Sequence, residues 1–296
     1  MAGSAGSILV LTFSRAELLH ELLESISNLK NRNDVKLIVV RQTGYEEVGK
    51  VIEKWRNNIE VLLEIDGVGN SSPENIGRNR LSGYAVAFDA LGSDWVLAVE
   101  EDVLLAEDSL LFTKFIVDKF NKKRNFRGIN LGSRLPVSDI GKNSYCKTRY
   151  GVYGQGAVMT RKTWRRMQAW KVIEYSRFGH WDAAMESYMK TGLSIAPNNS
   201  RYLDRGWTGT HTPSNPEDPY YLDITNSYVG SIPLASLPNY KQADIGYWWR
   251  SDLRKFKPWE SLYFWCIFIV RHPLSIKIYR QIRNLKQKTS EKVKFW

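Results

Sequence analysis

Cysteine is scarce in this chain of 296 residues, which contains only Cys146 and Cys266. The two lie far apart in dissimilar surroundings, so neither a disulfide framework nor a cysteine zinc site is indicated, and a reducing compartment is the simpler expectation. Residues 262–270 form an apolar stretch. This stretch falls short of the ~20 residues that a membrane-spanning helix needs.

The chain also shows little of what a targeting segment or a repeat would require. Residues 1–7 lack the basic residues and the apolar run of a signal peptide, and we interpret them as an expression scar. No internal repeat is found. Acidic residues are outnumbered, with 31 Asp and Glu against 42 Lys and Arg, for a formal net charge of +11.

Many of the cations follow residue 250, where they flank aromatic and aliphatic residues. This pattern favours an anionic membrane surface over nucleic acid as the partner. We therefore predict that residues 246–296 form a basic amphipathic helical tail, with peripheral membrane contact through residues 259–296. The alternative is a C-terminal helix that packs on the preceding domain and turns a basic face outward.

Apolar strands alternate with amphipathic helices in the first third of the chain. Predicted strands cover residues 8–13, 35–40, 59–65 and 95–99, and predicted helices start after Ser14 and cover residues 46–55 and 73–91. Ser14 is expected to cap the first helix, with Glu17 at the capping-box spacing. The alternation indicates an open, mostly parallel α/β sheet with helices on both faces.

The pattern loosens further along the chain. We expect a helix at residues 106–122 and strands at residues 128–131 and 153–159. Residues 213–241 are rich in Pro, Asn, Asp, Ser and Tyr without a clear period. This composition predicts a loop over a site.

Polar residues follow the first, second and fourth predicted strands. Ser14 and Arg15 follow the first, Gln42 the second, and the acidic triplet Glu100, Glu101 and Asp102 the fourth. Ligands of open α/β sheets bind beyond the carboxyl ends of the strands, so these segments are expected to converge on one crevice.

The acidic triplet at residues 100–102 concentrates negative charge, which a bound cation would neutralise. A divalent metal, Mn²⁺ or Mg²⁺, between the triplet and the phosphates of a sugar nucleotide would offset both charges. By chain position Asp102 is the expected metal ligand, and Glu100 and Glu101 are expected to hold ribose or sugar hydroxyls or metal-bound water. The competing interpretation is an acidic helix start, because carboxylates favour helix N-termini.

Five segments in this order carry a resemblance to a known family: residues 8–15, 41–47, 100–102, 153–156 and 181–182. Together they resemble the inverting N-acetylglucosaminyltransferase family that includes the enzyme initiating complex N-glycans and the related protein O-mannose enzyme. The resemblance extends from residue 8 to about residue 211. It implies a GT-A (Rossmann-like) domain at residues 8–245, with a donor half at about 8–105 and an acceptor half at about 106–245.

The resemblance also implies roles for two arginines. Arg15 would contact the nucleotide and Arg78 would approach the diphosphate, tasks that suit the planar guanidinium fork. The sequence departs from the family at two positions. Gln42 stands where the family has an acid that contacts the base, and Asn79 stands where it has a His. Gln42 can still hydrogen-bond a uracil through its amide.

In the acceptor half, Asp182 matches the family position of the general base, which an inverting transfer needs beside the acceptor hydroxyl. The alternative is that Asp182 caps a helix. Glu186, one helical turn on, is the reserve candidate for the base. His211 lies near a family position at the base of a donor-covering loop, where a role on the metal or the diphosphate competes with that of an ordinary loop residue.

Gly154, Gln155 and Gly156 are expected to form the floor under the donor sugar, since glycine permits close approach of the backbone to a ligand. A bulge in an ordinary strand is an equal alternative.

The resemblance predicts an inverting, metal-dependent glycosyltransferase that moves a hexose or N-acetylhexosamine from a UDP-sugar to a glycan or lipid-linked glycan acceptor. The expected location is the cytoplasmic face of the cell membrane, with no nucleic-acid partner. A retaining GT-A enzyme of surface polysaccharide synthesis is an alternative. A sugar nucleotidyltransferase is another, although such an enzyme normally has a Gly-rich basic loop after strand one, and Ser14 and Arg15 begin no such loop. A noncatalytic glycan-binding protein would need neither metal nor base.

Overall fold

The computed structural model describes residues 5–66, 73–132, 145–148, 155–169, 188–189, 192–197 and 200–206. The helices are α1 (Ala16–Ser27), α2 (Glu46–Lys54), α3 (Pro73–Ala85), α4 (Ser109–Phe120) and α5 (Arg161–Ala169), with two short 3-10 turns, η1 (Arg32–Asp34) and η2 (Arg56–Asn58), and a π-helical turn, η3 (Val86–Ala90). Residues 246–296, with the predicted tail, and residues 213–241, with the predicted loop, lie outside the described residues.

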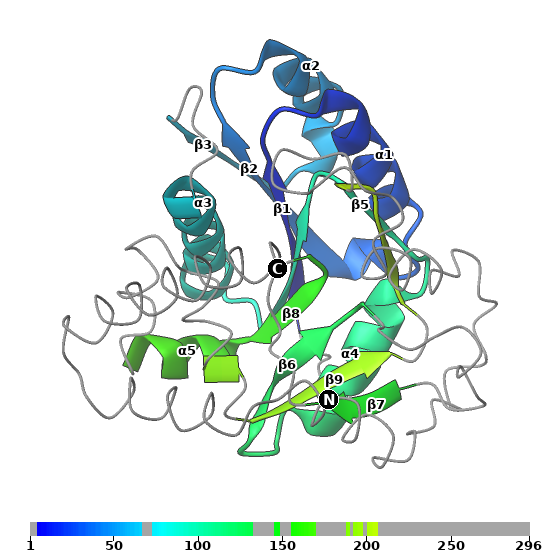
Figure 1. Ribbon diagram of the computed structural model, residues 1–296, viewed down its shortest axis with the longest axis vertical. Coiled ribbons are helices and arrows are strands. Elements are labelled where there is room, and N and C mark those ends of the chain that lie inside the picture. The colour runs from blue at the N-terminus through cyan, green and yellow to red at the C-terminus, as the bar shows by residue number, and fades with distance from the viewer. Residues whose placement is uncertain are drawn as a thin grey trace, which may run out of the picture. The chain divides into compact units, whose positions relative to one another are not determined.

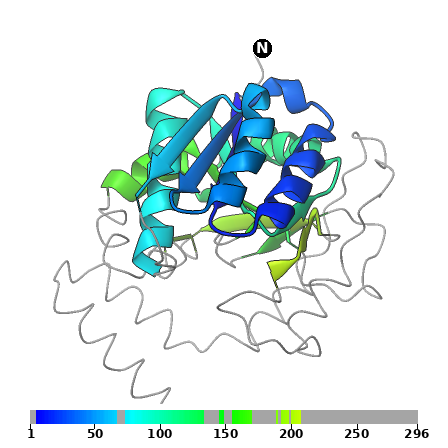
Figure 2. The same ribbon diagram turned by 90° about the horizontal axis from the view of Figure 1, so that it is seen from above.

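One eight-stranded sheet organises the described chain, in the order β3-β2-β1-β4-β8-β6-β9-β7 (Figures 1 and 2). Its strands are β1 (Gly6–Thr12), β2 (Val35–Gln42), β3 (Val61–Ile65), β4 (Trp95–Glu100), β6 (Phe126–Asn130), β7 (Tyr145–Thr148), β8 (Ala157–Thr160) and β9 (Leu193–Pro197). The first four strands pair in parallel, and β6 pairs in parallel with β9. The predicted open, mostly parallel sheet is confirmed.

Two strands run against the others. β8 pairs antiparallel with both β4 and β6, and β7 pairs antiparallel with β9. A separate two-stranded ribbon joins β5 (Val103–Leu105) to β10 (Tyr202–Asp204) in antiparallel register. The ribbon connects segments about a hundred residues apart, and it starts directly after the acidic triplet.

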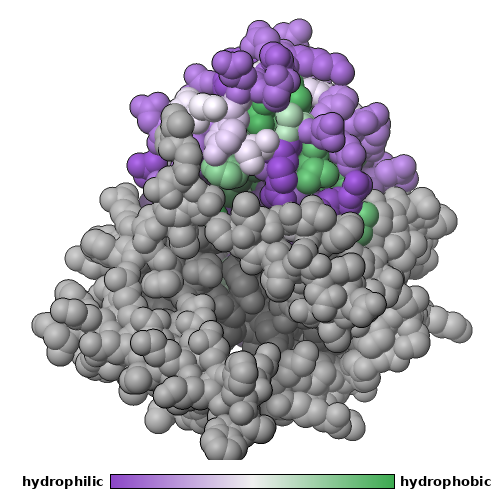
Figure 3. Space-filling model, turned by 45° about the horizontal axis from the view of Figure 1, so that its top comes forward, coloured by the Kyte–Doolittle hydropathy of each residue, from purple (hydrophilic) through white to green (hydrophobic). Residues whose placement is uncertain are grey.

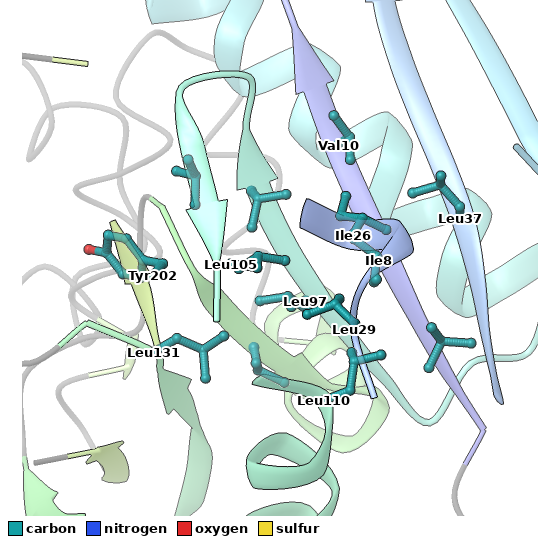
Figure 4. Close-up of a cluster of buried hydrophobic side chains, with 14 of the residues drawn as sticks. Ile8, Val10, Ile26, Leu29, Leu37, Leu97, Leu105, Leu110, Leu131 and Tyr202 are labelled. Carbon is teal, nitrogen blue, oxygen red and sulfur yellow. The ribbon is translucent and has the colours of Figure 1, made fainter. Parts of the chain in front are cut away.

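Helices cover both faces of the sheet, as the periodicity predicts. The cluster of buried side chains in Figure 4 joins one face of β1, β2 and β4 to α1, α2 and α4; it includes Ile8, Leu37, Leu97, Ile26 and Leu110. On the opposite face, α3 approaches so closely that a Cβ atom on Gly83 would lie 2.4 Å from Leu9 Cδ1. Both faces of the parallel strands are therefore buried, which is why these strands are continuous apolar runs.

The outer surface is largely polar in the described part of the view in Figure 3, where hydrophobic side chains show only in small areas. This fits helices that bury one face and leave the other in water. Among the described residues, no helix has the length and apolar character that crossing a membrane requires.

Two helix predictions need correction. Ser14 does not cap α1: the N-cap residue is Arg15, and its own side chain makes no capping hydrogen bond. The helix predicted over residues 73–91 ends as α3 at Ala85 and continues as η3, in which Leu91 N–H donates to Val86 O at 2.9 Å. A period of 3.6 does not distinguish such a wide final turn from a continued α-helix.

Candidate active site

The carboxyl ends of β1 and β4 bring the first loop and the acidic triplet together. β1 and β4 are parallel neighbours with Leu11 opposite Glu100, and Glu101 N–H donates to Leu11 O at 3.0 Å. The three residues between β1 and α1 therefore lie beside Glu101 and Asp102. The sequence predicts a crevice for a ligand at this edge of the sheet.

Glu101 points into the chain instead of into the crevice. Its carboxylate, 2% exposed, accepts the backbone N–H groups of Phe13, Ser14 and Arg15 at 2.6, 3.2 and 3.1 Å. An anion at a helix N-terminus satisfies free N–H groups and the helix dipole. Glu101, just after β4, therefore fixes the loop before α1, and its last contact is the N–H of the N-cap residue Arg15.

The Glu101→Gln variant is expected to lose stability. A glutamine amide keeps one acceptor oxygen where the carboxylate has two, and buried N–H groups left without a partner cost about 1–3 kcal/mol. Urea unfolding should show the loss as a lower midpoint. Glu107→Gln, which removes a partner of Lys30 in an exposed pair at 3.5 Å, is the matched control and should change the midpoint little. An unchanged midpoint in Glu101→Gln would contradict the role of its carboxylate.

Asp102 is buried and contacts two polar side chains. Arg15 donates from Nη2 to Asp102 Oδ2 at 2.7 Å and from Nε to Glu101 Oε1 at 3.1 Å. Gln155 donates from Nε2 to Asp102 Oδ1 at 3.1 Å. The structure thus unites three predicted site residues, Arg15, Asp102 and Gln155, from three separate parts of the chain.

Asp204 is a site residue that the sequence reasoning missed. It ends β10, where it is paired with Val103, and the next residue, Arg205, donates its N–H to Asp102 O at 2.7 Å. A three-residue strand is too short to show the alternation of apolar and polar residues, so no pattern in the sequence predicts the β5-β10 ribbon. The ribbon adds another carboxylate to the crevice.

The crevice holds more acid than base. Burial raises the pKa of Asp102 to about 7, with Glu100 and Asp204 adding to the rise and Arg15 opposing it. Burial also raises the pKa of Asp204, helped by Glu100 and opposed by the Gly206 N–H and by Arg15. Carboxylates gathered in this way favour the binding of a further cation.

The comparisons with known proteins concern the fold. No protein-family model and no curated protein matches the sequence. The structure is similar to S. aureus TarS 1-349 with a TM-score of 0.50 and 13% identity, over 67% of this chain and 59% of that one. It also matches the mannosyltransferase PcManGT from Pyrobaculum calidifontis, solved with GDP-Man and Mn²⁺, with a TM-score of 0.45 and 15% identity, over 67% and 55%.

The chain has a GT-A fold. It spans about three fifths of the TarS fragment. The fold implied by the family resemblance is confirmed, whereas the N-acetylglucosaminyltransferase family itself is matched by no family model.

Glu100 is held on the far side of this GT-A crevice by a residue that the sequence did not single out. Arg80 of α3 is fully buried and donates from Nη2 to Glu100 Oε1 at 2.6 Å. Glu100 keeps 30% of its side chain exposed. The triplet is thus divided: Glu100 faces α3, Glu101 faces the first loop, and Asp102 faces the β5-β10 ribbon.

The other predicted donor residues lie on different elements: Gln42 on β2, Arg78 on α3 and Ser14 in the loop before α1. Gln42 is buried at the end of β2. Arg78 is exposed and donates to Asp66 O at 3.0 Å, just after β3, and within the described residues no contact joins it to the triplet. Ser14 is exposed in the loop before α1.

Gly156 has a conformation that favours glycine. Its φ is +67°, and a Cβ atom there would lie 2.4 Å from Tyr202 Cδ1. Gln155 and Gly156 form a turn before β8, so the strand predicted from residue 153 begins only at Ala157. Gly156 thus permits the close approach of Tyr202 on the ribbon beside Asp102.

Four predicted site residues lie outside the described residues: Gly154, Asp182, Glu186 and His211. Within the described ranges, no group of three or more His, Cys, Asp or Glu side chains is arranged to hold a metal. The described part of the crevice therefore supplies carboxylates for a cation without a complete protein shell.

Proposed function

We propose that this chain is a glycosyltransferase that transfers a sugar from a nucleotide-diphosphate donor. The observation that carries the proposal is the place of Asp102, buried at the carboxyl end of β4 with Arg15 on one carboxylate oxygen and Gln155 on the other. In open α/β sheets such as that of a GT-A fold, ligands bind beyond the carboxyl ends of the parallel strands, and Asp102 lies at such an end.

The residues present fit a divalent metal. Carboxylates are the ligands that Mg²⁺ and Mn²⁺ prefer, and Mg²⁺ commonly binds through one or two of them while water and substrate phosphates complete its shell. Gly206 packs closely against Asp102: a Cβ atom there would lie 2.2 Å from Asp102 Oδ2, so a larger residue would displace the carboxylate. When bound at Asp102, the metal would supply positive charge for the departing diphosphate.

The chain's own residues would orient the donor around that charge. Arg15 reaches the crevice from the first loop, and its Nη1 is buried without a hydrogen-bond partner among the described residues. Gln42, at the end of β2, and Arg78, on α3, would lie on the nucleotide side. Gln155, with Gly154 and Gly156, would lie under the sugar.

The β1–α1 loop favours a glycosyltransferase over a nucleotidyltransferase. Phe13, Ser14 and Arg15 include no glycine, and their N–H groups already bind Glu101. These groups are therefore not free to hold a triphosphate, as a glycine-rich phosphate loop would.

Finer features belong to the same proposal. The donor is a UDP-sugar, and the S. aureus TarS fragment, whose fold this chain shares, has been solved with UDP-GlcNAc. The acceptor is a glycan or a lipid-linked glycan, and transfer proceeds with inversion, with His211 as a further metal or diphosphate ligand. Residues 259–296 contact the membrane from the cytoplasmic side.

The test of the function is donor cleavage. The full chain is incubated with a panel of UDP-, GDP- and dTDP-sugars, each with Mn²⁺, with Mg²⁺ or with EDTA, and release of the nucleoside diphosphate is followed. We expect release from UDP-sugars with either metal and none with EDTA. Cleavage of no nucleotide sugar, with an intact fold and either metal, would contradict the proposal.

The Asp182→Asn variant is expected to lose sugar transfer by about 10²–10⁴-fold, the range of a missing general base, while Mn²⁺-dependent UDP binding stays unchanged. Glu186→Gln is the matched comparison and should keep transfer. The reverse pattern would assign the base to Glu186, and full transfer in both variants would contradict a carboxylate base in this segment. The anomeric configuration of the product, read by NMR, tests inversion.

A further inference from the structure

Asp102 and Asp204 both lie close to Gly206. A Cβ atom on Gly206 would lie 2.2 Å from Asp102 Oδ2 and 3.1 Å from Asp204 Oδ1. The Gly206 N–H donates to Asp204 Oδ1 at 2.7 Å and so fixes this carboxylate. One oxygen of each carboxylate therefore lies near the same point beside Gly206, so the two oxygens are close to one another.

In the chain without a ligand, the positive charge next to Asp102 is that of the Arg15 side chain. The Arg15 guanidinium contacts Asp102 through Oδ2, the same oxygen that faces Gly206. Arg15 has a second anchor, since its Nε donates to Glu101 Oε1. Glu101 in turn is held by three backbone N–H groups, so the loop does not depend on the contact between Arg15 and Asp102.

We propose that Asp204 is a second carboxylate ligand of the metal at Asp102, and that Arg15 competes with that metal for Asp102. The proposal rests on the proposed function, because it assigns residues to the metal that the transfer uses. Two carboxylates suit a hard divalent cation that keeps water and phosphate oxygens as its other ligands. The guanidinium fork of Arg15 pairs equally well with phosphate oxygens, so a nucleotide offers it another partner.

The competition has a direct consequence for binding order. A nucleoside diphosphate that engages Arg15 frees Asp102 Oδ2 for the metal. Each ligand then strengthens the binding of the other by the same factor, as linkage requires. Arg15 thereby couples the arrival of the donor to the formation of the metal site.

The experiment titrates Mn²⁺ alone into the full chain and measures free Mn²⁺ by electron paramagnetic resonance. Asp204→Asn keeps the acceptor for the Gly206 N–H while it removes the charge, and should weaken Mn²⁺ binding about tenfold or more. Arg15→Gln should tighten Mn²⁺ binding by up to about fivefold, because Mn²⁺ would no longer have to displace a part-exposed ion pair from Asp102. The two variants are thus expected to move the affinity in opposite directions.

The controls are drawn from the neighbouring strand ends, where Arg41 donates to Glu64 at 2.8 Å. Arg41→Gln and Glu64→Gln make the same charge changes outside the crevice and should leave the Mn²⁺ affinity within about twofold, since exposed charges are screened. Circular dichroism and thermal unfolding check that each variant folds.

The outcomes separate this inference from the proposed function. Wild-type affinity in Asp204→Asn, with binding lost in Asp102→Asn, would overturn the role of Asp204 and leave the metal at Asp102 in place. Unchanged or weaker Mn²⁺ binding in Arg15→Gln would overturn the competition. Equal Mn²⁺ binding in the wild type and in Asp102→Asn would overturn the metal site itself.

Discussion

Replacing Asp102 by Asn is expected to abolish metal-dependent cleavage of the sugar nucleotide, with a fall of at least about 10²-fold, the scale of a lost electrostatic contact to the leaving group. Asn keeps the shape of Asp and an acceptor for Gln155, whose Nε2 lies 3.1 Å from Asp102 Oδ1. It lacks the charge that a divalent cation requires. The rate of nucleoside diphosphate release with Mn²⁺ measures the effect.

The fold should survive this substitution. Burial raises the pKa of Asp102 in the folded chain to about 7 from 3.8. A carboxylic acid whose folded pKa is raised contributes stability below the unfolded pKa and loses that contribution as the pH rises through the folded pKa. At pH 8, without metal, the Asn variant should therefore unfold at a urea concentration no lower than the wild type.

Glu64→Gln is the control for the Asp102 experiment. Glu64 is half exposed at the end of β3 and pairs with Arg41, away from Asp102. Its loss should leave metal-dependent cleavage unchanged. Activity retained by Asp102→Asn at the wild-type level would contradict a metal at this residue.

Gly206→Ala is expected to lower metal-dependent cleavage of the sugar nucleotide about as much as Asp102→Asn does. The new Cβ atom would lie 2.2 Å from Asp102 Oδ2, closer than real contacts allow, so the Asp102 carboxylate or the chain after β10 must move. A displacement of about 1 Å in a catalytic group can cost about 10²-fold in rate. Nucleoside diphosphate release is the measurement, and Mn²⁺ affinity should fall with it.

Gly49→Ala is the matched substitution for Gly206→Ala. A Cβ atom on Gly49 would meet the far end of the flexible Arg41 side chain, 2.4 Å from Nη2, which can move away. Alanine is also the better helix former inside α2, so this variant should keep activity and gain up to about 1 kcal/mol in stability. Full activity in Gly206→Ala would show that residue 206 does not limit the space at Asp102.

Much of the fold could be predicted from local patterns in the sequence. Continuous apolar runs, each followed by an amphipathic helix, predict parallel strands buried on both faces, and β1 to β4 lie close to their predicted bounds. Helix ends were less predictable. Ser14 has the right residue type for a cap, but α1 begins one residue later than predicted, with Arg15 as its N-cap, and the Ser14 N–H donates to Glu101.

Some contacts inside the site follow from the sequence, whereas others depend on the tertiary structure. The meeting of Arg15 with Asp102 follows from the parallel pairing of two strands that the sequence itself predicts. Arg80, with its contact to Glu100, was missed because a fully buried arginine on α3 looks like any charged helix residue until the packing of α3 is known. Gln155 was predicted for the sugar, and its contact with Asp102 depends on the antiparallel strand β8.

By itself, the sequence determined the α/β order of the first half and the place of Asp102 at a strand end, because periodicity and strand ends are properties of neighbouring residues. Tertiary structure alone decided which way each acid points and brought Asp204 and Gly206 beside Asp102. Those positions depend on a ribbon of two three-residue strands that lie about a hundred residues apart, and no local pattern records such a pairing.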